Sequence, residues 1–219
     1  MKLYIDSKLR DKCPNTCIGS VEAKVRVSSS SEELLKVMDD VCKKIEDTID
    51  TKSISTIKNI SDSRSAYRRV GKDPTRYRLS SEALIRRVAK SNGLYKVNNV
   101  VDINNIVSLD SAYSVGTYDL GKLKGDVKFT VGETGETYTG IGKGDINIEN
   151  LPVFEDEEGK FGSTTSDSTR AMITTDSSHI LMNIISFNGD EELVKYMDLA
   201  EELLIKYADG EIINKDIVK

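Results

Sequence analysis

The sequence predicts an α+β protein, a single mixed α/β domain in which a small antiparallel meander packs against helices. Two patterns lead to this fold class. Apolar residues recur every three or four positions over 34–49 and 193–207, whereas residues 21–27 and 126–149 alternate between apolar and polar. A chain of 219 residues with 38% hydrophobic and 31% charged residues can bury one core, which excludes a disordered chain.

The first expected elements are two strands and a long helix. Residues 2–5 and 21–27 predict strands. Ser30 and Glu33 have the spacing of a capping box, so the serine is expected to begin a helix. An apolar stripe that continues to about Ile49 gives this helix one face for the core.

Two shorter helices are expected in the middle of the chain, after a long connection. Residues 50–80 are mostly polar and predict a loop. Ser80 is placed to cap a short helix that ends before Gly93. Asp102 is placed to cap another, whose apolar side consists of Ile103, Ile106 and Val107.

The second half begins with short strands and ends with a helix. Residues 126–149 contain three alternating segments separated by glycine-rich turns, which predicts the meander. Gly140–Gly144 resembles a phosphate-binding loop, but Asp145 follows where Ser or Thr is required, so a tight turn is expected. Residues 179–186 predict a buried strand, and residues 190–207 predict the last helix.

Charge is unevenly distributed along an acidic chain whose formal net charge is −5. Residues 58–96 hold eleven positive residues and three negative ones, whereas residues 145–219 hold six positive and seventeen negative. A basic segment attracts phosphate or another anion, although such a run is often only a solvated face. The chain has no Trp and 6% aromatic residues, which disfavours a base-stacking platform.

The cysteines and the one histidine predict neither a metal site nor a cofactor. Cys13, Cys17 and Cys42 are an odd number, which is typical of free thiols in a reducing compartment. Cys13 and Cys17 are four residues apart and could bind a metal, but only His179 and no second close pair of cysteines are present to complete a tetrahedral zinc site. His179 lies in an apolar strand and is expected to be a core histidine rather than a base.

The chain also predicts no membrane partner. No run approaches the roughly 18 apolar residues of a membrane span. The first residues lack the apolar centre of a signal peptide, so a cytoplasmic location is expected.

An arginine-rich segment is the first candidate binding site. Arg76, Arg78, Arg86 and Arg87 surround a predicted helix N-terminus, whose backbone amides favour anions. Arginine suits two-point binding of phosphate or carboxylate, so we expect these four residues to bind an anion. The alternative is that Arg86 and Arg87 form salt bridges within the protein.

A hydroxyl-rich segment, Gly162–Arg170, is the second candidate. Its polar side chains offer short hydrogen-bond donors and acceptors for a ligand, and we select Ser163, Thr165, Asp167 and Arg170. The same residues could instead form a network of Asx and Ser/Thr turns, and both interpretations stay open.

Four segments in this order resemble a known family: RYRLSSEALIRRV, NNVVDINNIVSL, SVGTYDLGKLKGD and GKFGSTTSDSTRAMI. They look like the B3/B4 domain of the phenylalanyl-tRNA synthetase β chain, and more closely like freestanding proteins built from that domain. The resemblance covers 67–207, with 1–66 as an N-terminal extension and 208–219 as a tail, so residues 1–219 are expected to form one domain.

The resemblance implies a pocket that, in the synthetase, hydrolyses tRNA wrongly charged with tyrosine. The family's Asp-x-x-Asn stretch matches Asp102 and Asn105, and the family's threonine before that Asn is Asn104 here. The editing histidine falls on Gly116, and the glutamate that recognises the tyrosine hydroxyl falls on Asn183.

These two departures change the expected pocket. Gly116 is expected to enlarge it and to remove a hydrogen-bonding group, which leaves the catalytic residue unidentified. We expect Asn105, Gly116, Tyr118 and Asp167 to surround the aminoacyl group. Hydrolysis would then depend on a water held by backbone groups and on the terminal hydroxyl of the tRNA.

The predicted function is therefore binding of tRNA or the 3′ end of aminoacyl-tRNA, with no DNA partner. The RNA phosphates are expected to contact Arg76, Arg78, Arg86 and Arg87. Whether mischarged aminoacyl-tRNA is hydrolysed in trans stays open, as does the oligomeric state. Ligation by this chain alone is excluded, because nothing resembles the ATP-binding motifs of a class II synthetase. The alternative is a non-catalytic binder of a small amino-acid-like ligand or of a protein partner.

Overall fold

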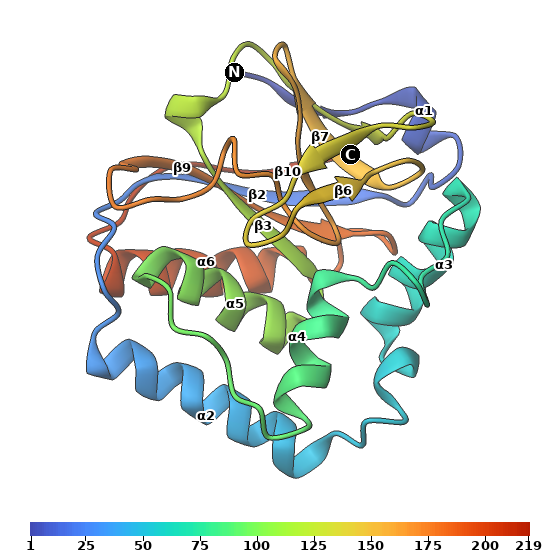
Figure 1. The fold of residues 1–219 in the computed structure, drawn as a ribbon. Helices are drawn as coiled ribbons and strands as arrows, with labels where there is room; N and C mark the ends of the chain where they lie inside the picture. The colour runs from blue at the N-terminus through green and yellow to red at the C-terminus, as the bar shows by residue number, and fades with distance from the viewer.

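The computed structural model describes residues 1–219 and has a layered arrangement (Figure 1). A central sheet crosses the middle of the molecule, with helices below it and a second sheet above it. This architecture confirms the predicted α+β class.

The central sheet is fully antiparallel and has the strand order β10-β2-β9-β3. Its members are β2 (Cys17–Lys24), β3 (Ser114–Asp119), β9 (His179–Ser186) and β10 (Glu211–Val218). Strand β9 is buried except at its first residue, as its apolar sequence predicts. The expected tail contributes β10, an edge strand, because its residues pair along nearly the whole length of β2.

The second sheet has the order β1-β4-β7-β8, and only the β1–β4 pair is parallel. It consists of β1 (Leu3–Ile5), β4 (Val127–Val131), β7 (Pro152–Asp156) and β8 (Gly159–Ser163). The sequence predicts that β4 pairs with the next strand of the meander, and this prediction is wrong. Strand β4 pairs with β1 and β7 rather than with the strand that follows it, and four of its five residues are buried.

The remainder of the meander is a separate hairpin of β5 (Thr137–Thr139) and β6 (Asp145–Asn147). Gly140–Gly144 forms the turn between these strands, as expected, and the positive φ of 65° at Gly142 favours glycine.

Four helices follow the expected pattern with shifted starts. They are α2 (Glu32–Thr48), α4 (Ser80–Val88), α5 (Asn99–Ser111) and α6 (Leu193–Tyr207). Helix α2 begins one residue later than predicted, because the Ser31 hydroxyl, not that of Ser30, accepts the capping bond.

Helix α5 begins four residues earlier than predicted, because Asn98 caps it. Asp102 lies inside the first turn, fully buried, and does not act as the cap. Its carboxylate accepts hydrogen bonds from the Ser30 hydroxyl at 2.6 Å and from the Val97 backbone N–H at 3.1 Å. Asp102 therefore joins the start of α5 to the segment before α2.

The predicted loop over 50–80 is wrong, because it contains helix α3 (Lys58–Val70) and a 3₁₀ turn, η1 (Ile54–Thr56). The buried face of α3 includes Asn59 and Ser63, so the apolar stripe that would indicate a helix is interrupted. Two further short segments, α1 (Ser7–Arg10) and η2 (Leu120–Lys122), complete the chain.

Two hydrophobic cores occupy the two faces of the central sheet. Ile180, Met182 and Ile184 of β9 point toward the helices, whereas Ile185 points toward the second sheet. Asn183 shares the face of Ile185 because side chains alternate along the strand.

Other sequence predictions have mixed outcomes. Cys13, Cys17 and Cys42 are free and buried. His179 is not a core residue, because its side chain is 42% exposed and its Nε2 lies 2.8 Å from a Glu22 carboxylate oxygen. No helix has both the length and the apolar composition that crossing a bilayer requires.

Candidate functional site

A buried polar cluster lies between the two sheets, beneath residues 163–167. Gly116 of β3 and Asn183 of β9 are register partners, so their side-chain positions are adjacent. Tyr118 follows Gly116 on the same face of β3. The Asn183 side chain is completely buried, and neither its oxygen nor its nitrogen has a hydrogen-bond partner.

Tyr118 fills the space in which the sequence predicts an enlarged pocket. A Cβ atom at Gly116 would lie 2.3 Å from the Tyr118 hydroxyl, and one at Gly162 would lie 2.2 Å from it. The ring also makes edge contacts with Phe154 and Phe161, whose centroids are 5.5 and 4.9 Å away. The expectation that Gly116 enlarges a pocket is therefore wrong in this structure, because the tyrosine ring occupies the vacated volume.

Asp167 is the carboxylate of this cluster. Its Oδ1 accepts hydrogen bonds from the Tyr118 hydroxyl at 2.9 Å and from the Ser163 backbone N–H at 3.0 Å. Burial raises the pKa of Asp167 to about 6, and these two donors only partly offset that effect. Burial also raises the pKa of Tyr118, so its hydroxyl remains a donor at neutral pH.

The hydroxyl-rich segment Gly162–Arg170 forms a network of turns, which is one of the two structures that the sequence allows for it. The Ser163 hydroxyl accepts from the backbone N–H groups of Thr165 and Ser166, and it donates to the Ser166 carbonyl at 2.7 Å. Ser163 and Thr165 therefore have internal partners.

Two further tyrosines, which the sequence analysis did not select, hold this turn. The Tyr67 hydroxyl lies 2.5 Å from the Thr164 hydroxyl and 2.8 Å from that of Thr165. The Tyr138 hydroxyl donates to the Ser166 carbonyl at 2.5 Å. With Tyr118, three tyrosines from three different elements converge on residues 163–167, which only the tertiary structure reveals.

Asn104 and Asn105 do not join this cluster. The Asn104 side-chain oxygen accepts from the Thr117 hydroxyl at 2.9 Å. Thr117 alternates with Gly116 and Tyr118 along β3, so its side chain lies on the helix-covered face of the sheet. The two asparagines of α5 are thus separated from Tyr118 by the sheet itself.

Arg170 is also directed elsewhere. Its guanidinium donates to both oxygens of Asp156, at 2.7 and 3.0 Å, and to the Gly159 carbonyl at 2.8 Å. This two-point ion pair closes the β7–β8 hairpin and leaves Arg170 outside the polar cluster.

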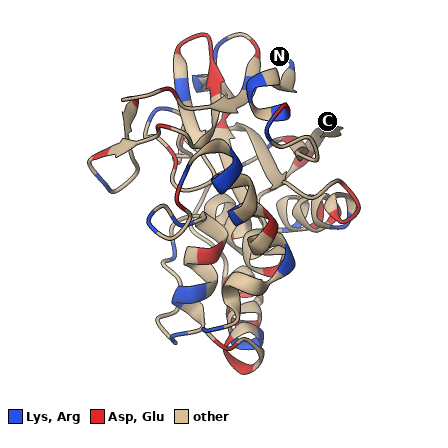
Figure 2. Ribbon diagram, turned by 90° about the vertical axis from the view of Figure 1, so that its right-hand side faces the viewer, with Lys and Arg blue, Asp and Glu red and all other residues tan.

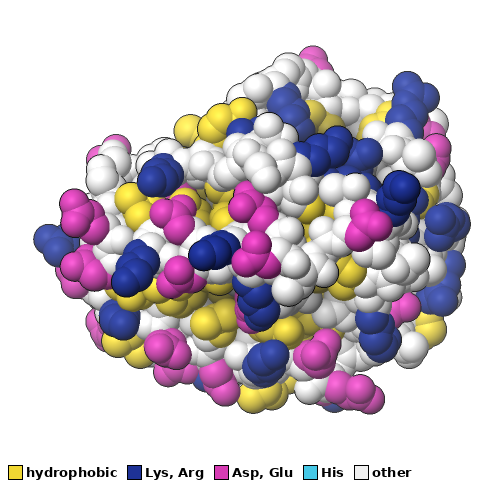
Figure 3. Space-filling model, turned by 90° about the horizontal axis from the view of Figure 1, so that it is seen from below, with side chains coloured by type: hydrophobic (Ala, Val, Ile, Leu, Met, Phe, Trp, Pro, Cys, Tyr) yellow, Lys and Arg dark blue, Asp and Glu magenta, His cyan; other side chains and the backbone are white.

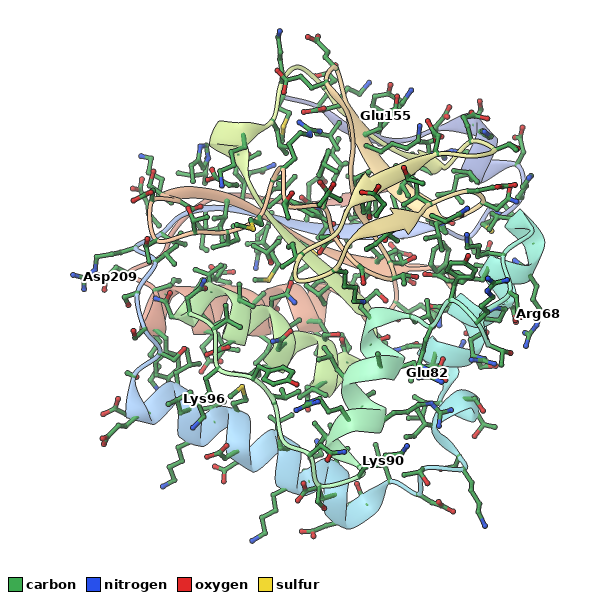
Figure 4. All side chains as sticks on the ribbon, viewed as in Figure 1. Arg68, Glu82, Lys90, Lys96, Glu155 and Asp209 are labelled. Carbon is green, nitrogen blue, oxygen red and sulfur yellow. The ribbon has the colours of Figure 1, made fainter.

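Two of the four predicted phosphate-binding arginines have internal partners. Glu82 of α4 is 1% exposed, and its carboxylate accepts from Arg64 at 2.9 Å and from Arg86 at 2.9 Å. Figure 4 labels Glu82 where α4 faces α3. The Arg87 guanidinium donates to the Gly93 carbonyl at 2.8 Å. Arg86 and Arg87 are therefore committed to the fold, and the spacing of four between Glu82 and Arg86 was the signal for it.

Arg76 and Arg78 remain available to solvent. Arg76 is exposed, and the Arg78 side chain is 47% exposed with its Nε 3.9 Å from Glu82. The backbone N–H of Ser80 donates to the Thr164 carbonyl at 2.9 Å, so the backbone just after Arg78 contacts the 163–167 turn. Lys143, from the β5–β6 hairpin, donates to the Ser166 hydroxyl at 2.9 Å. We call Arg76, Arg78 and Lys143 the cationic rim.

Elsewhere the surface charges are mixed. Figure 2, which faces the α3 side, shows basic segments interspersed with acidic ones. Figure 3 shows the same interleaving over the helical layer. The positive potential is therefore local to small groups such as the rim.

Comparison with known proteins then assigns the fold to a family. The model of the B3/4 domain family matches residues 62–203, which is more than half of the chain. The chain belongs to the B3/4 domain family.

The structure is similar to an N-terminal fragment of the phenylalanyl-tRNA synthetase β-subunit from Pyrococcus horikoshii, with a TM-score of 0.50 and 15% identity. The match covers 100% of this chain and 54% of that fragment, so the likeness shows the fold. No curated protein sequence matches the chain.

The matched part of this B3/4 domain begins within α3 and ends within α6. It includes the Tyr118 cluster and the cationic rim but excludes β2 and β10. The two strands at one side of the central sheet, β10 and β2, therefore lie outside the family match.

The B3/4 domain also carries surface hollows away from Tyr118. One of 450 Å³ is lined by Glu22, Asp126 and His179, and another of 420 Å³ is lined by Asn59, Tyr113 and Asn188. Asn59, Tyr113 and Asn188 are already joined to their neighbours by hydrogen bonds.

Proposed function

We propose that this B3/4 domain binds tRNA through the aminoacylated 3′ end. The cationic rim would contact phosphates, and the Tyr118 cluster would face the aminoacyl group. One observation carries the proposal. Arg76 and Arg78 are exposed on the segment that leads into the 163–167 turn contact, in a chain whose fold is similar to that of a phenylalanyl-tRNA synthetase β-subunit fragment.

The contact would be electrostatic and confined to a few phosphates. The guanidinium groups of Arg76 and Arg78 can each bind a phosphate at two points, whereas Lys143 supplies a single charge. The remaining surface carries both signs of charge, so the protein would hold the end of the RNA rather than a long stretch.

Hydrolysis of a mischarged aminoacyl ester in trans would be the reaction of this site. Water would attack the ester carbonyl, and the ribose oxygen would leave with a proton. Gly116 cannot transfer a proton, so water would be positioned by backbone groups and by the neighbouring hydroxyl of the terminal ribose. Such proofreading acts where binding alone separates similar side chains by only about 1–3 kcal/mol.

Binding of uncharged tRNA tests the rim. The double variant Arg76→Ala/Arg78→Ala is expected to reduce the salt dependence, the slope of log K against log salt concentration, by about two. Arg87→Ala is the matched control, because this arginine donates to a backbone carbonyl. An unchanged affinity and slope in the double variant would contradict the phosphate contact.

Incubation with a panel of mischarged tRNAs tests the reaction. We expect release of amino acid from at least one member and a reduced rate in Asp167→Ala, because Asp167 anchors the cluster. Asn105→Ala should leave the rate unchanged, since Asn105 belongs to helix α5 on the other face of the sheet. Release that neither variant alters would remove the site from this cluster.

A second candidate is a non-catalytic binder of a small amino-acid-like molecule or a protein partner. The observation that favours it is the Tyr118 ring, which fills the space beside Gly116. Calorimetry with free amino acids distinguishes the two: binding of an amino acid with no effect of tRNA would favour the non-catalytic function.

A further inference from the structure

The arginines of this B3/4 domain fall into two groups. Six of the ten are held within the protein by a hydrogen bond or a close ion pair: Arg10, Arg26, Arg64, Arg86, Arg87 and Arg170. The other four donate to no carbonyl or carboxylate at hydrogen-bond distance, and all of them lie within residues 68–78: Arg68, Arg69, Arg76 and Arg78. The same segment contains one acid, Asp73. Arginines that the fold does not use are therefore concentrated in one short stretch of chain.

Arg68 and Arg69 end helix α3 and do not belong to the cationic rim. Both side chains are exposed. The one acid of this helix, Asp62, pairs with Lys58 and accepts from Asn188 instead. Figure 4 labels Arg68 at the outer side of α3, where its side chain points away from the molecule. These two guanidinium groups are thus available to a partner in solution.

Lys12 adds a third exposed cation beside the end of α3. It follows helix α1 and precedes Cys13, whose Sγ lies 3.9 Å from a backbone carbonyl oxygen of α3. Burial raises the pKa of the Cys13 thiol, and the charges of Arg69 and Lys12 oppose that shift, so both cations lie near the same thiol. We call Arg68, Arg69 and Lys12 the α3 cluster.

The α3 cluster continues the positive charge of the rim. Arg64 lies one helical turn before Arg68 on the same face of α3, and its guanidinium donates to the Pro74 carbonyl at 3.3 Å. The segment after α3 therefore folds back along this face, and Arg76 follows Pro74 by two residues. Positive charge consequently extends from the rim across the end of α3 to α1.

The α3 cluster suits base-paired RNA better than a single strand. Single-strand sites combine cations with aromatic rings on which bases stack. The aromatic residue of α3, Tyr67, is completely buried, so this helix offers no ring for stacking. Cations alone position a nucleic acid through its backbone, which is how double-stranded RNA is mostly held.

We propose that the α3 cluster binds phosphates of a base-paired RNA stem, next to the single-stranded 3′ end that the rim would hold. Arg68 and Arg69 would each bind a phosphate at two points, and Lys12 would supply a single charge. This inference rests on the proposed function for the identity of the RNA. It extends the contact from the 3′ end to the first base pairs beside it.

Three RNAs separate the two contacts: a hairpin with a single-stranded 3′ tail, the same hairpin with a blunt end, and the tail alone. We expect Arg68→Gln/Arg69→Gln to reduce the slope of log K against log salt concentration by about two for both hairpins. Lys12→Gln should reduce it by about one. The tail alone should bind these variants and the wild type equally.

Lys36→Gln/Lys43→Gln is the matched control. Both lysines are exposed on α2, and their removal changes the net charge of the protein as much as the arginine variant does. The control should bind all three RNAs as the wild type does. An equal loss of slope in the control would assign the effect to net charge, and the proposal would be wrong.

The blunt hairpin provides the decisive measurement. If the wild type does not bind it, or if neither Arg68→Gln/Arg69→Gln nor Lys12→Gln weakens its binding, the α3 cluster is not a stem site. Lys12→Gln leaves α3 unchanged, so it tests the cluster even if the arginine variant disturbs that helix. Weaker binding of the tail alone by either variant would place the cluster in the rim and also overturn the proposal.

The rim and the α3 cluster fail separately. Arg76→Ala/Arg78→Ala should weaken binding of the tail alone and leave the blunt hairpin unaffected. Unchanged binding of the tail by that variant would contradict the proposed function, whereas the result for the blunt hairpin decides the stem contact.

Discussion

Two buried polar clusters of this B3/4 domain differ in how completely their groups are paired. Around Glu82, three arginines supply charge to one carboxylate, and Arg64 and Arg86 donate to it directly. Around Tyr118, the Asp167 carboxylate has two donors and no cation, and the Asn183 amide has no partner.

The difference separates residues that hold the fold from residues that are free to act. A fully paired buried charge is a structural joint, here between α3 and α4. A partly paired polar group in a shaped space is a place that another molecule can complete. The predictions below test this contrast, from the largest expected effect to the smallest.

Glu82→Ala should lower the free energy of unfolding by about 3–5 kcal/mol, because it leaves two mostly buried guanidinium groups without a counter-charge. Urea unfolding measures the change. Glu158→Ala is the control, because this glutamate pairs with Arg170 on the surface and should cost less than about 1 kcal/mol. A loss below about 1 kcal/mol for Glu82→Ala would contradict the role of Glu82 as a structural joint between α3 and α4.

Asp167 should make the protein less stable as the pH rises. Its folded-state pKa of about 6 lies above the ordinary value of 3.8, so the folded state binds the proton more tightly. This contribution to the free energy of unfolding is fully present below pH 4 and is lost as the pH rises through 6. The loss is about 3 kcal/mol, because each pKa unit corresponds to about 1.36 kcal/mol.

Asp167→Asn removes that charge and keeps an oxygen acceptor for Tyr118. Relative to the wild type, the variant should therefore gain stability between pH 4 and pH 7. Parallel urea titrations at the two pH values measure the difference, in which contributions of other carboxylates cancel. A difference that does not change with pH would show that Asp167 titrates normally.

Asn183→Leu should raise the free energy of unfolding by about 1 kcal/mol, since leucine has a similar shape and no unsatisfied polar atoms. Thermal unfolding measures the change. Destabilisation by Asn183→Leu would show that the amide has a partner after all.

Arg78→Ala should change stability by less than about 0.5 kcal/mol, because its contact with Glu82 is long and its side chain is half exposed. The equivalent change at Arg86 should be clearly destabilising. If the two variants lose stability equally, Arg78 belongs to the structural joint and not to the cationic rim.

The sequence predicted the parts of the fold that depend on local periodicity. The apolar stripe of α2 and the apolar run of β9 each identified an element correctly. Helix α3 was missed, because Asn59 and Ser63 on its buried face interrupt the apolar pattern. Strand β10 was missed because most of its residues are exposed, so its formation depends on pairing with β2.

The candidate site was only partly predictable, because it too depends on contacts between residues that are distant in the sequence. The sequence by itself determined the family, the α+β class and the residues worth inspecting, because these follow from the identity and order of neighbouring residues. Only the tertiary structure decided that Tyr118 fills the space beside Gly116 and that a sheet separates Asn104 from Tyr118. The spacing of four already indicated a pair between Glu82 and Arg86, but only the tertiary structure showed that Arg64 joins this pair and that Arg76 stays exposed. Burial and pairing are properties of side chains brought together from distant positions, and no local pattern records them.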